Sequence, residues 1–360
     1  MYTIYHESME KTSLIWKIFE IGRLLVIMKK KILALVCVIS LVGSLTACSS
    51  SPNGDASEEK GTSKTVSDSK KAPEEITIGV SFGQNVHPFF VAMEAGIKQA
   101  CEDMGIEKCN ILSADSSLET QNSQIENLVT MGCDVILLNP YDSEGVINAV
   151  ADAGNAGVGV FTMDIDCEGS TAFIASDNKE IGKMLAKHVI DKLDGKGEIA
   201  IIDGITVTSL KDRTEGFMKA IEESDIEVVA EQQTAHGRET ALQSAENILQ
   251  AHPDINAFVG INENSGMAIL SAVTSANLKD VLITTVDATS ENLAAIRDGK
   301  VEVGVSQDPY QMGYQAVEQA IKWYSGEEID KFIEVKVEYM NKENVQEFID
   351  REVGYGVEMD

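Results

Sequence analysis

The chain has 360 residues, of which 44% are hydrophobic and 24% are charged. This balance is typical of a folded globular protein and argues against disorder, collagen-like repeats and a multi-span membrane protein. The 58 Asp and Glu residues outnumber the 29 Lys and Arg residues, which gives a formal net charge of −29. Such an acidic surface repels phosphate backbones, so we expect no nucleic-acid partner. The length predicts two domains, each able to bury its own core.

A secretory signal is predicted near the N-terminus, over residues 28–47. Met28 is followed by three lysines, then by an apolar run from Ile32 to Gly43 and by Leu45-Thr46-Ala47-Cys48. A basic stretch, a short apolar run and small residues are the marks of an export signal. The run is shorter than the roughly 20 residues of a membrane-spanning helix. The last four residues resemble the lipobox of bacterial lipoproteins, which implies cleavage before Cys48 and lipidation of its sulfur; an ordinary signal with a chance cysteine is the alternative.

The segments on either side of this signal are not expected to fold. Residues 1–27 precede the basic stretch with which a signal begins, and we interpret them as a mis-annotated start, an amphipathic leader being the weaker option. Residues 48–72 are rich in serine and contain Val66 as their only large apolar residue. Such a segment buries too little to fold, so we expect a flexible tether between a lipid anchor and the folded part.

Four cysteines remain in the folded part, at positions 101, 109, 133 and 167. Export permits disulfides, and four cysteines allow three pairings. Cys101 and Cys109 flank one predicted helix-to-strand turn and are placed to meet. We favour buried free thiols, because a core of this size needs no disulfide bond for stability.

Predicted strands and helices alternate through the rest of the chain. The strands are near-continuous apolar runs between helices, which indicates parallel sheets covered on both faces. We expect strands at 76–82, 111–112, 135–138, 158–163, 198–202, 227–230, 257–259, 281–286 and 332–337. We expect helices at 89–104, 118–131, 144–156, 179–193, 210–223, 239–250, 265–276 and 310–325, with a short one near Leu293.

Two such arrays of similar length predict an α/β fold with two doubly wound parallel-sheet lobes. We place the N-terminal lobe at residues 73–176 plus 308–335 and the C-terminal lobe at residues 177–307 plus 336–360. The chain then crosses between the lobes three times. Three crossovers would allow the lobes to close through small backbone rotations while each lobe stays rigid.

Polar residues follow nearly every predicted strand. In doubly wound folds these positions face the binding crevice, so the residues that follow the strands are the first candidates for a binding site. Carboxylates accept hydrogen bonds from hydroxyl groups, and amides both donate and accept them, which suits a hydroxylated ligand. Isolated Asn and Asp residues also form turns, which is the alternative for any single position. The strand-end segments are Gly83 to Phe90, Asn139 to Asp142, Asp164 to Asp166, Asp203, Asn262 to Asn264, Asp287 and Ser306 to Pro309.

Six short stretches in these regions carry a family resemblance. Over residues 73–360 the chain resembles the ribose/galactose-type, or type I periplasmic, sugar-binding proteins of bacterial ABC importers. The resemblance implies a hinged two-lobed protein that closes on one small carbohydrate and passes it to a permease. The stretches are Pro88 to Phe90, Leu138 to Ser143, Ile174 to Asn178, Arg213 to Phe217, Ala251 to Asp254 and Gln307 to Tyr310.

The resemblance also implies roles for individual side chains. Phe89 and Phe90 match aromatic residues that lie against the apolar face of a sugar ring, although Phe90 alternatively packs under its helix. Arg213 matches an arginine whose planar fork holds ligand oxygens; a surface ion pair with Glu215 is the alternative. The matching hydroxyl-binding groups are Asn139, Asp164, Asn262, Asp287 and Gln307, of which Asp287 is alternatively a buried turn carboxylate.

Three departures from the ribose type leave the identity of the sugar open. Ile165 and then Asp166 follow the first-lobe aspartate, where the ribose type has an arginine. His87 replaces the usual asparagine before Pro-Phe-Phe, and His236 occupies the position of a second-lobe aromatic residue. A different pentose, a hexose or a polyol fits equally well. We expect both histidines near the ligand; a metal site built from them and Asp164 lacks ligand spacing, so we expect no metal or cofactor.

Other functions were weighed against the same residues. The sequence has no Walker-type or paired-cysteine motif, and the serine of its Gly-x-Ser-x-Gly stretch, Gly79 to Gly83, falls within the strand predicted at 76–82, so we expect no enzyme activity. A sugar-responsive transcription regulator would need a DNA-binding segment ahead of this fold, and the chain has a predicted export signal there instead. A receptor for a sensor kinase or chemoreceptor, or for a quorum-sensing furanosyl signal, remains the alternative. We expect a monomeric extracytoplasmic lipoprotein that binds a monosaccharide or polyol, serves an ABC permease and meets the membrane through its anchor only.

Overall fold

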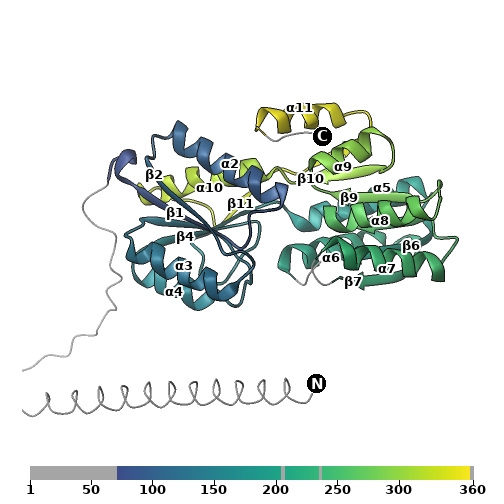
Figure 1. The fold of residues 1–360 in the computed structure, drawn as a ribbon, viewed down its shortest axis with the longest axis horizontal. Coiled ribbons are helices and arrows are strands. Elements are labelled where there is room, and N and C mark those ends of the chain that lie inside the picture. Colours follow the sequence, from purple (N-terminus) through teal and green to yellow (C-terminus); the bar gives the residue numbers. More distant parts are fainter. Residues whose placement is uncertain (1–70, 204–206, 235–236, 357–360) are drawn as a thin grey trace, which may run out of the picture. The chain divides into compact units, whose positions relative to one another are not determined.

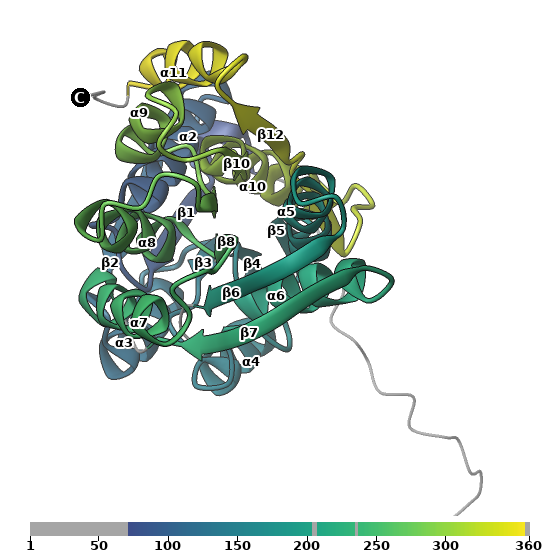
Figure 2. The ribbon, with the colours of Figure 1, turned by 90° about the vertical axis from the view of Figure 1, so that its right-hand side faces the viewer.

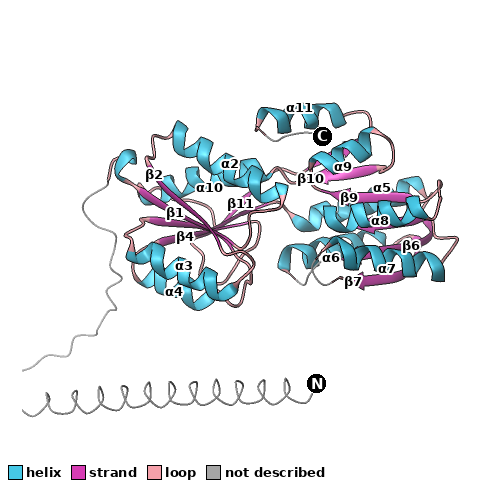
Figure 3. Cartoon of the chain, in the orientation of Figure 1, coloured by secondary structure: helices cyan, strands magenta, loops and turns pink. Residues whose placement is uncertain are grey.

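The computed structural model describes residues 71–203, 207–234 and 237–356. Within them, twelve strands form two six-stranded sheets, and helices pack on both faces of each sheet (Figures 1 and 3). The predicted α/β fold with two doubly wound lobes is therefore confirmed. The predictions for the leader, the signal, Cys48 and nearly all of the tether concern residues outside this description.

The first sheet is entirely parallel, with the strand order β11-β5-β4-β3-β1-β2. Its strands are β1 (Thr77–Phe82), β2 (Lys108–Ser113), β3 (Val135–Asn139), β4 (Gly159–Met163), β5 (Ala172–Ala175) and β11 (Phe332–Glu334), preceded by the 3-10 turn η1 (Pro73–Glu75). Successive strand residues enter different cores, because side chains alternate between the faces of a sheet. Leu137 packs in the core shared with α2 (Pro88–Asp103) and α10 (Pro309–Tyr324), whereas Ile136 and Leu138 pack in the core shared with α3 (Leu118–Thr130) and α4 (Ile147–Asn155).

The second sheet has the order β12-β10-β9-β8-β6-β7, in which only β12 runs antiparallel to its neighbour (Figure 2). Its strands are β6 (Lys196–Asp203), β7 (Asp225–Gln233), β8 (Ala257–Gly260), β9 (Leu282–Val286), β10 (Val303–Ser306) and β12 (Glu338–Asn341). One face is covered by α5 (Asn178–Lys192) and α6 (Thr208–Ile221). The other is covered by α7 (Arg238–Ala251), α8 (Glu263–Ser275), α9 (Ser290–Arg297) and α11 (Val345–Gly354).

The chain passes between the two sheets at three places, as the predicted three-crossover hinge requires. It leaves the first sheet after β5, returns to it after β10 and leaves it again after β11. Two of the crossings touch, because the Ser176 hydroxyl donates to the Gln307 carbonyl oxygen over 3.2 Å. The crossing after β5 and the crossing after β10 are therefore joined by a hydrogen bond, although they are distant in sequence.

Some elements differ from the sequence expectations. The strands β5, β10 and β12 were not predicted as strands, and α11 was not predicted at all; each of these strands has only four residues. The expected helix at 144–156 begins later, at Ile147, because the Asp142 carboxylate accepts from the backbone N–H groups of Glu144 and Gly145 and holds a turn there. The strand expected at 332–337 divides into β11 and the approach to β12.

Glycine allows two helix pairs to approach at backbone distance. On α2, a Cβ atom at Gly96 would overlap the carbonyl oxygen of Tyr310 on α10. On α5, a Cβ atom at Gly182 would overlap the carbonyl oxygen of Arg213 on α6. The second contact fixes the backbone of Arg213, whose side chain points toward the site described next.

Candidate functional site

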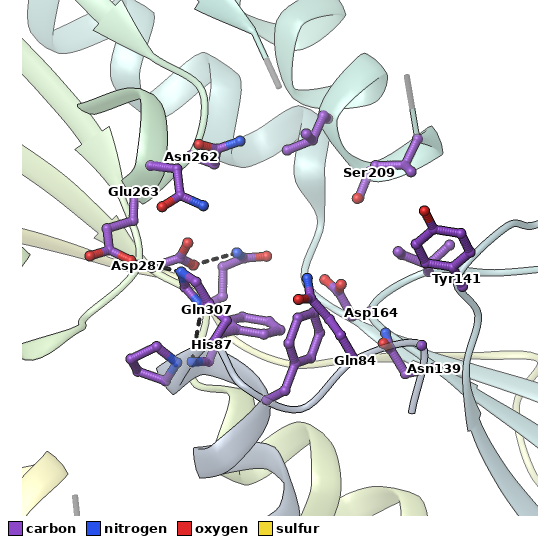
Figure 4. A pocket seen from close by; sticks show the side chains of 18 of the residues that line it. Gln84, His87, Asn139, Tyr141, Asp164, Ser209, Asn262, Glu263, Asp287 and Gln307 are labelled. Atoms are coloured by element: carbon purple, nitrogen blue, oxygen red, sulfur yellow. Dashed lines mark hydrogen bonds and ion pairs between the residues drawn. The ribbon is translucent and has the colours of Figure 1, made fainter. Parts of the chain in front are cut away.

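A cavity of about 740 Å³ lies where the carboxyl ends of strands from both sheets face each other. Its size falls within the usual range of small-molecule pockets. Figure 4 shows Gln84, Asn139, Tyr141 and Asp164 of the first lobe on one side and Asn262, Glu263 and Asp287 of the second lobe on the other. Strand ends from two separate sheets thus supply side chains to one space, as the doubly wound fold predicts.

The N-terminus of α2 brings the aromatic residues to the cavity. Pro88 occupies the first turn, and His87 caps the helix by accepting the Phe89 N–H on Nδ1 over 3.2 Å. The rings of Phe89 and Phe90 meet edge to face, with centroids 5.2 Å apart. Both rings line the cavity. Phe89 belongs to the hydrophobic core and Phe90 is half-buried, so Phe90 is the more exposed of the two.

The first lobe presents acceptor oxygens from two neighbouring strand ends. Asn139 ends β3 and donates its amide N–H to the Met163 carbonyl oxygen over 3.0 Å, which leaves its Oδ1 as the free end. Asp164 follows β4 in a left-handed backbone conformation, with φ of 64°. Burial raises the pKa of Asp164 to about 7, against the lowering effect of the Arg213 charge and with a further rise from Asp287.

Behind these groups, a buried glutamine holds the loop that follows β3. The Gln121 side chain is fully buried; it donates to the Asn139 carbonyl oxygen over 2.9 Å and accepts from the Tyr141 N–H over 2.8 Å. This pair of bonds orients the backbone on both sides of Pro140. The predicted carboxylate Asp166, in contrast, accepts from Thr162 and Ser170 and does not line the cavity.

Arg213 lies at the centre of the second-lobe network and is 2% exposed. Its Nε and Nη2 donate to Asn178 Oδ1 over 3.2 and 2.6 Å, Nη1 donates to the Ile261 carbonyl oxygen over 2.5 Å, and Nη2 also donates to Gln307 Oε1 over 3.1 Å. Since a guanidinium group has five N–H donors, one Nη1 hydrogen remains for a ligand. The alternative ion pair with Glu215 is wrong, because Glu215 pairs with Lys179 on the surface.

The other second-lobe groups are oriented in the same way. Gln307 Nε2 donates to Asp287 Oδ1 over 2.6 Å, so Asp287 keeps one free carboxylate oxygen. Burial raises the pKa of Asp287, against the opposing Arg213 charge and the Gln307 hydrogen bond. Asn262 caps α8 by accepting the Ser265 N–H on Oδ1 over 2.9 Å, which leaves its Nδ2 hydrogens as donors.

A direct contact joins the two lobes at one side of the cavity. His87 Nε2 of the first lobe lies 2.9 Å from Glu263 Oε2 of the second lobe, and Arg238 lies 3.6 Å from the other Glu263 oxygen. Burial opposes ionisation of His87, but the Glu263 hydrogen bond and charge outweigh it and raise the pKa of His87. Both ring nitrogens of His87 are therefore engaged by protein groups.

Nine of the ten predicted ligand-binding residues line this one cavity, and the tenth, His236, lies outside the described residues. The cavity is also lined by Gln84, Tyr141 and Glu263, which were not predicted as ligand-binding residues. All three stand in the strand-end segments, so their position after a strand could have indicated them. Ser209 and Leu210 also line the cavity, and no sequence signal indicates them.

The other described histidines and the four described cysteines do not line the cavity. His188 on α5 bonds the Tyr339 hydroxyl, and His252 lies 3.8 Å from Glu198, both away from the cavity. Cys101, Cys109, Cys133 and Cys167 are free thiols, of which Cys109 is half-buried and the others are buried. No group of three His, Cys, Asp or Glu side chains in the described ranges is arranged to hold a metal ion. Across the same ranges, no helix combines the length and the apolar character needed to span a membrane.

Residues 78–328, which span most of both lobes, match the family model described as a periplasmic binding protein domain. The chain belongs to the periplasmic binding protein family. This family consists of solute-binding proteins, so its members act by capturing a solute outside the cytoplasmic membrane. The type I fold expected from the resemblance is confirmed by the match and by solved relatives of the same architecture.

Sequence and structure place the chain near sugar-binding members of the periplasmic binding protein family. The ribose import binding protein of Bacillus subtilis is 33% identical over 307 residues, covering 84% of this chain and 96% of the relative. A solute-binding protein of Actinobacillus succinogenes, solved with bound D-allose, has a TM-score of 0.72 and 26% identity and covers 76% of this chain and 100% of its own. One from Bacillus halodurans, solved with myo-inositol, has a TM-score of 0.73 and 27% identity and covers 79% and 100%.

Proposed function

We propose that the chain is the extracytoplasmic receptor of an ABC importer and that it captures one monosaccharide or polyol by closure of its two lobes. Ribose, allose and myo-inositol, named for the similar proteins above, define the size and chemistry of the solute. Family membership supports the importer partner. We further propose that the protein delivers its solute unchanged, without catalysis.

One observation carries the proposal: hydrogen-bonding groups from both sheets converge on a single cavity beside an aromatic ring. Acceptor oxygens on Asn139, Asp164 and Asp287 suit hydroxyl hydrogens, and donors on Asn262 and Arg213 suit hydroxyl or ring oxygens. The half-buried Phe90 offers a surface for the C–H face of a sugar ring. This mixture suits a solute that has many hydroxyl groups and one apolar face.

Capture follows from the placement of these groups on separate lobes. A solute held by Asn139, Asp164 and Phe90 would meet Asn262 and Asp287 when the lobes close. Closure expels water, which strengthens each polar contact, and each hydrogen bond to a charged group contributes about 1.5–3 kcal/mol. Arg213 acts mainly by orientation, because most of its donors already hold Asn178, Ile261 and Gln307 in place.

Retention at the membrane is proposed from the sequence. A lipid on Cys48 would hold the protein at the outer face of the cytoplasmic membrane, and the serine-rich segment that follows would act as a tether. As a random coil, that segment spans roughly 25–30 Å, which allows the lobes to reach a permease.

The test is a ligand screen on the purified protein beginning at Cys48. Thermal shift and calorimetry are run against pentoses, hexoses and polyols, and we expect one of these solutes to bind. Asp287→Asn should weaken binding of that solute by about tenfold or more, equivalent to about 1.4 kcal/mol, because it removes a charged acceptor. Asp298→Asn, on the exposed surface, is the matched control and should leave affinity unchanged. A screen without any ligand contradicts the proposal.

A further inference from the structure

The buried charges of the cavity do not balance. Asp164 is 8% exposed, Asp287 is 7% exposed and Arg213 is 2% exposed, so two carboxylates share one buried cation. Neither carboxylate forms a direct ion pair with Arg213, whose donors bind neutral oxygens instead. When both carboxylates are ionised, the interior of the site carries one uncompensated negative charge.

Asp164 is the carboxylate that lacks a protein partner. Within the described parts of the chain, no hydrogen bond or ion pair reaches its oxygens, and its interactions with Arg213 and Asp287 are purely through charge. Asp287, in contrast, accepts from Gln307. A buried carboxylate without a donor is costly unless something else supplies one. Because Asp164 lines the cavity, the ligand is the group placed to do so.

The immediate neighbour of Asp164 adds a further acceptor. The Asn139 amide donates to the carbonyl of Met163, the residue directly before Asp164, and this bond fixes the orientation of the amide. Its Oδ1 is left without a protein donor in the described residues. The first lobe therefore offers three acceptor oxygens at one place: two on Asp164 and one on Asn139.

We propose that the solute carries a protonated amine that binds at Asp164 and Asn139, so that the preferred ligand is an amino sugar or an aminopolyol. An ammonium group has three donors, no acceptor and one positive charge. It therefore matches three acceptor oxygens and one surplus negative charge together, whereas a hydroxyl group donates one hydrogen and brings no charge. This inference rests on the proposed function and narrows its ligand class.

The outer rim of the cavity does not remove the charge imbalance. Glu263 faces His87 and Arg238, and Arg238 in turn pairs with Glu291. These four groups sum to zero when His87 is protonated and to one negative charge when it is neutral. In both cases the cavity as a whole is acidic. Burial raises the pKa of Asp164 to about 7, and a bound ammonium group would lower it again by favouring the ionised form.

The experiment compares matched solutes that differ only in the amine. Calorimetry at pH 7 is performed with D-glucosamine, D-glucose and N-acetyl-D-glucosamine, with the corresponding galactose set, and with an aminodeoxyinositol against myo-inositol. N-acetylation keeps the substituent and removes its charge. In at least one frame, the amine should bind more tightly than its hydroxyl and N-acetyl partners by about tenfold or more.

A variant then assigns the preference to Asp164. Asp164→Asn keeps the shape of the side chain and removes its charge, so the amine preference should disappear. Asp166→Asn is the control, since Asp166 lies two residues away and does not line the cavity. A hydroxyl partner that binds as tightly as the amine in every frame, or a preference that survives Asp164→Asn, overturns the inference and leaves the proposed function intact. A panel in which no member binds, while a neutral solute binds in the wider screen, also overturns only the inference; a panel and a wider screen that are both without a ligand contradict the proposed function itself.

Discussion

The carboxyl group of Asp164, which we propose as a ligand contact, is buried at a cost to folding. The residue is 8% exposed, follows β4 with φ of 64° and has no protein donor in the described residues. Non-glycine residues in this conformation are uncommon and concentrate at functional sites, although the short polar side chain of Asp tolerates it. Asp287 and Asp308, also at strand ends, share the conformation.

Asp164→Asn should therefore stabilise the ligand-free protein at pH 8. Burial raises the pKa of Asp164 to about 7, so ionisation above that pH costs folding free energy. Between the unfolded pKa and pH 7 the folded state binds the extra proton, and stability falls as pH rises through this window. We expect a gain of about 1–3 kcal/mol at pH 8, since one pKa unit is worth about 1.4 kcal/mol.

Urea unfolding at two pH values tests this prediction. At pH 5 the wild-type Asp164 is already protonated in the folded state, so the gain should shrink toward zero. Asp298→Asn, on the exposed surface, serves as the control and should show no such gain at pH 8. An equal gain at both pH values would show that something other than ionisation is responsible.

At this scale, sequence reasoning reaches the residues that follow strands and misses those that depend on tertiary approach. Asn139, Asp164 and Asp287 were found because the strand-end rule is local. Ser209, in the first turn of α6, lines the cavity, but no local sequence pattern distinguishes it from a surface serine. His87 lines the cavity, but its contact with Glu263 depends on the approach of the two lobes, which no local pattern encodes.

The helices that frame the site depend on a close backbone approach. On α2, which carries His87 and Phe89 at its start, Gly96 faces the carbonyl oxygen of Tyr310 on α10 without room for a side chain. Any shift of α2 would move the aromatic residues of the cavity. The helix pair therefore sets the position of one wall of the site.

Gly96→Ala should destabilise the first lobe by about 2–4 kcal/mol, because the added methyl group meets backbone that cannot rotate away. Gly154→Ala on α4 is the matched control: nothing lies within reach of its Cβ, and alanine is the better helix former, so stability should rise by up to about 1 kcal/mol. Thermal unfolding distinguishes the two. Similar effects from both variants would contradict the packing account.

The starts of α2 and α8 form a contact between lobes through His87 and Glu263. Glu263→Gln should weaken this contact and widen the distribution of distances between the lobes, because a neutral amide accepts the His87 Nε2–H less strongly than a carboxylate does. The raised pKa of His87 means that the contact contributes fully at low pH and is lost as pH rises through the folded value. The lobes of the wild type should thus be held together more firmly at pH 6 than at pH 8.

Distance measurements between spin labels on the two lobes test this contact. Glu291→Gln is the control, because Glu291 is exposed and pairs with Arg238 but not with His87. A distance distribution that is the same in Glu263→Gln and in the wild type at both pH values would show that the contact does not influence closure.

Long apolar runs made most elements predictable, and short or polar ones were missed. The run at β1 is buried almost throughout, and the start of α2 is marked by Pro88. The strand β5 has four residues and no alternation to separate it from a loop. Its identity as a strand comes from hydrogen bonds to β4 and β11, the latter nearly 160 residues away in sequence.

At the scale of the whole molecule, three chain crossings connect two separately packed lobes. Each lobe has its own pair of hydrophobic cores, so each can move as a unit. The crossings after β5 and β10 touch through Ser176 and Gln307, and Gln307 also bonds Arg213 and Asp287. The ligand contact proposed at Asp287 is thus linked by direct hydrogen bonds to the crossing segments.

The predicted anchor is also a property of the whole molecule. Cys48→Ser should shift the protein from the membrane fraction to the soluble fraction or the medium, since the cysteine sulfur is the proposed site of lipid attachment. Cys101→Ser is the control, as this buried thiol lies within the folded part. Labelling with a radioactive fatty acid measures the lipid directly, and a labelled, membrane-bound Cys48→Ser protein would rule out this attachment site.

The distribution of the sheet strands has a practical use. Strand β1 lies in one sheet and α11 packs on the other, so the described residues begin in one lobe and end in the other. The distance between a donor fluorophore placed ahead of β1 and an acceptor placed beyond α11 would change whenever the two lobes close. The protein is thereby suited to conversion into a ratiometric optical sensor for its own cargo.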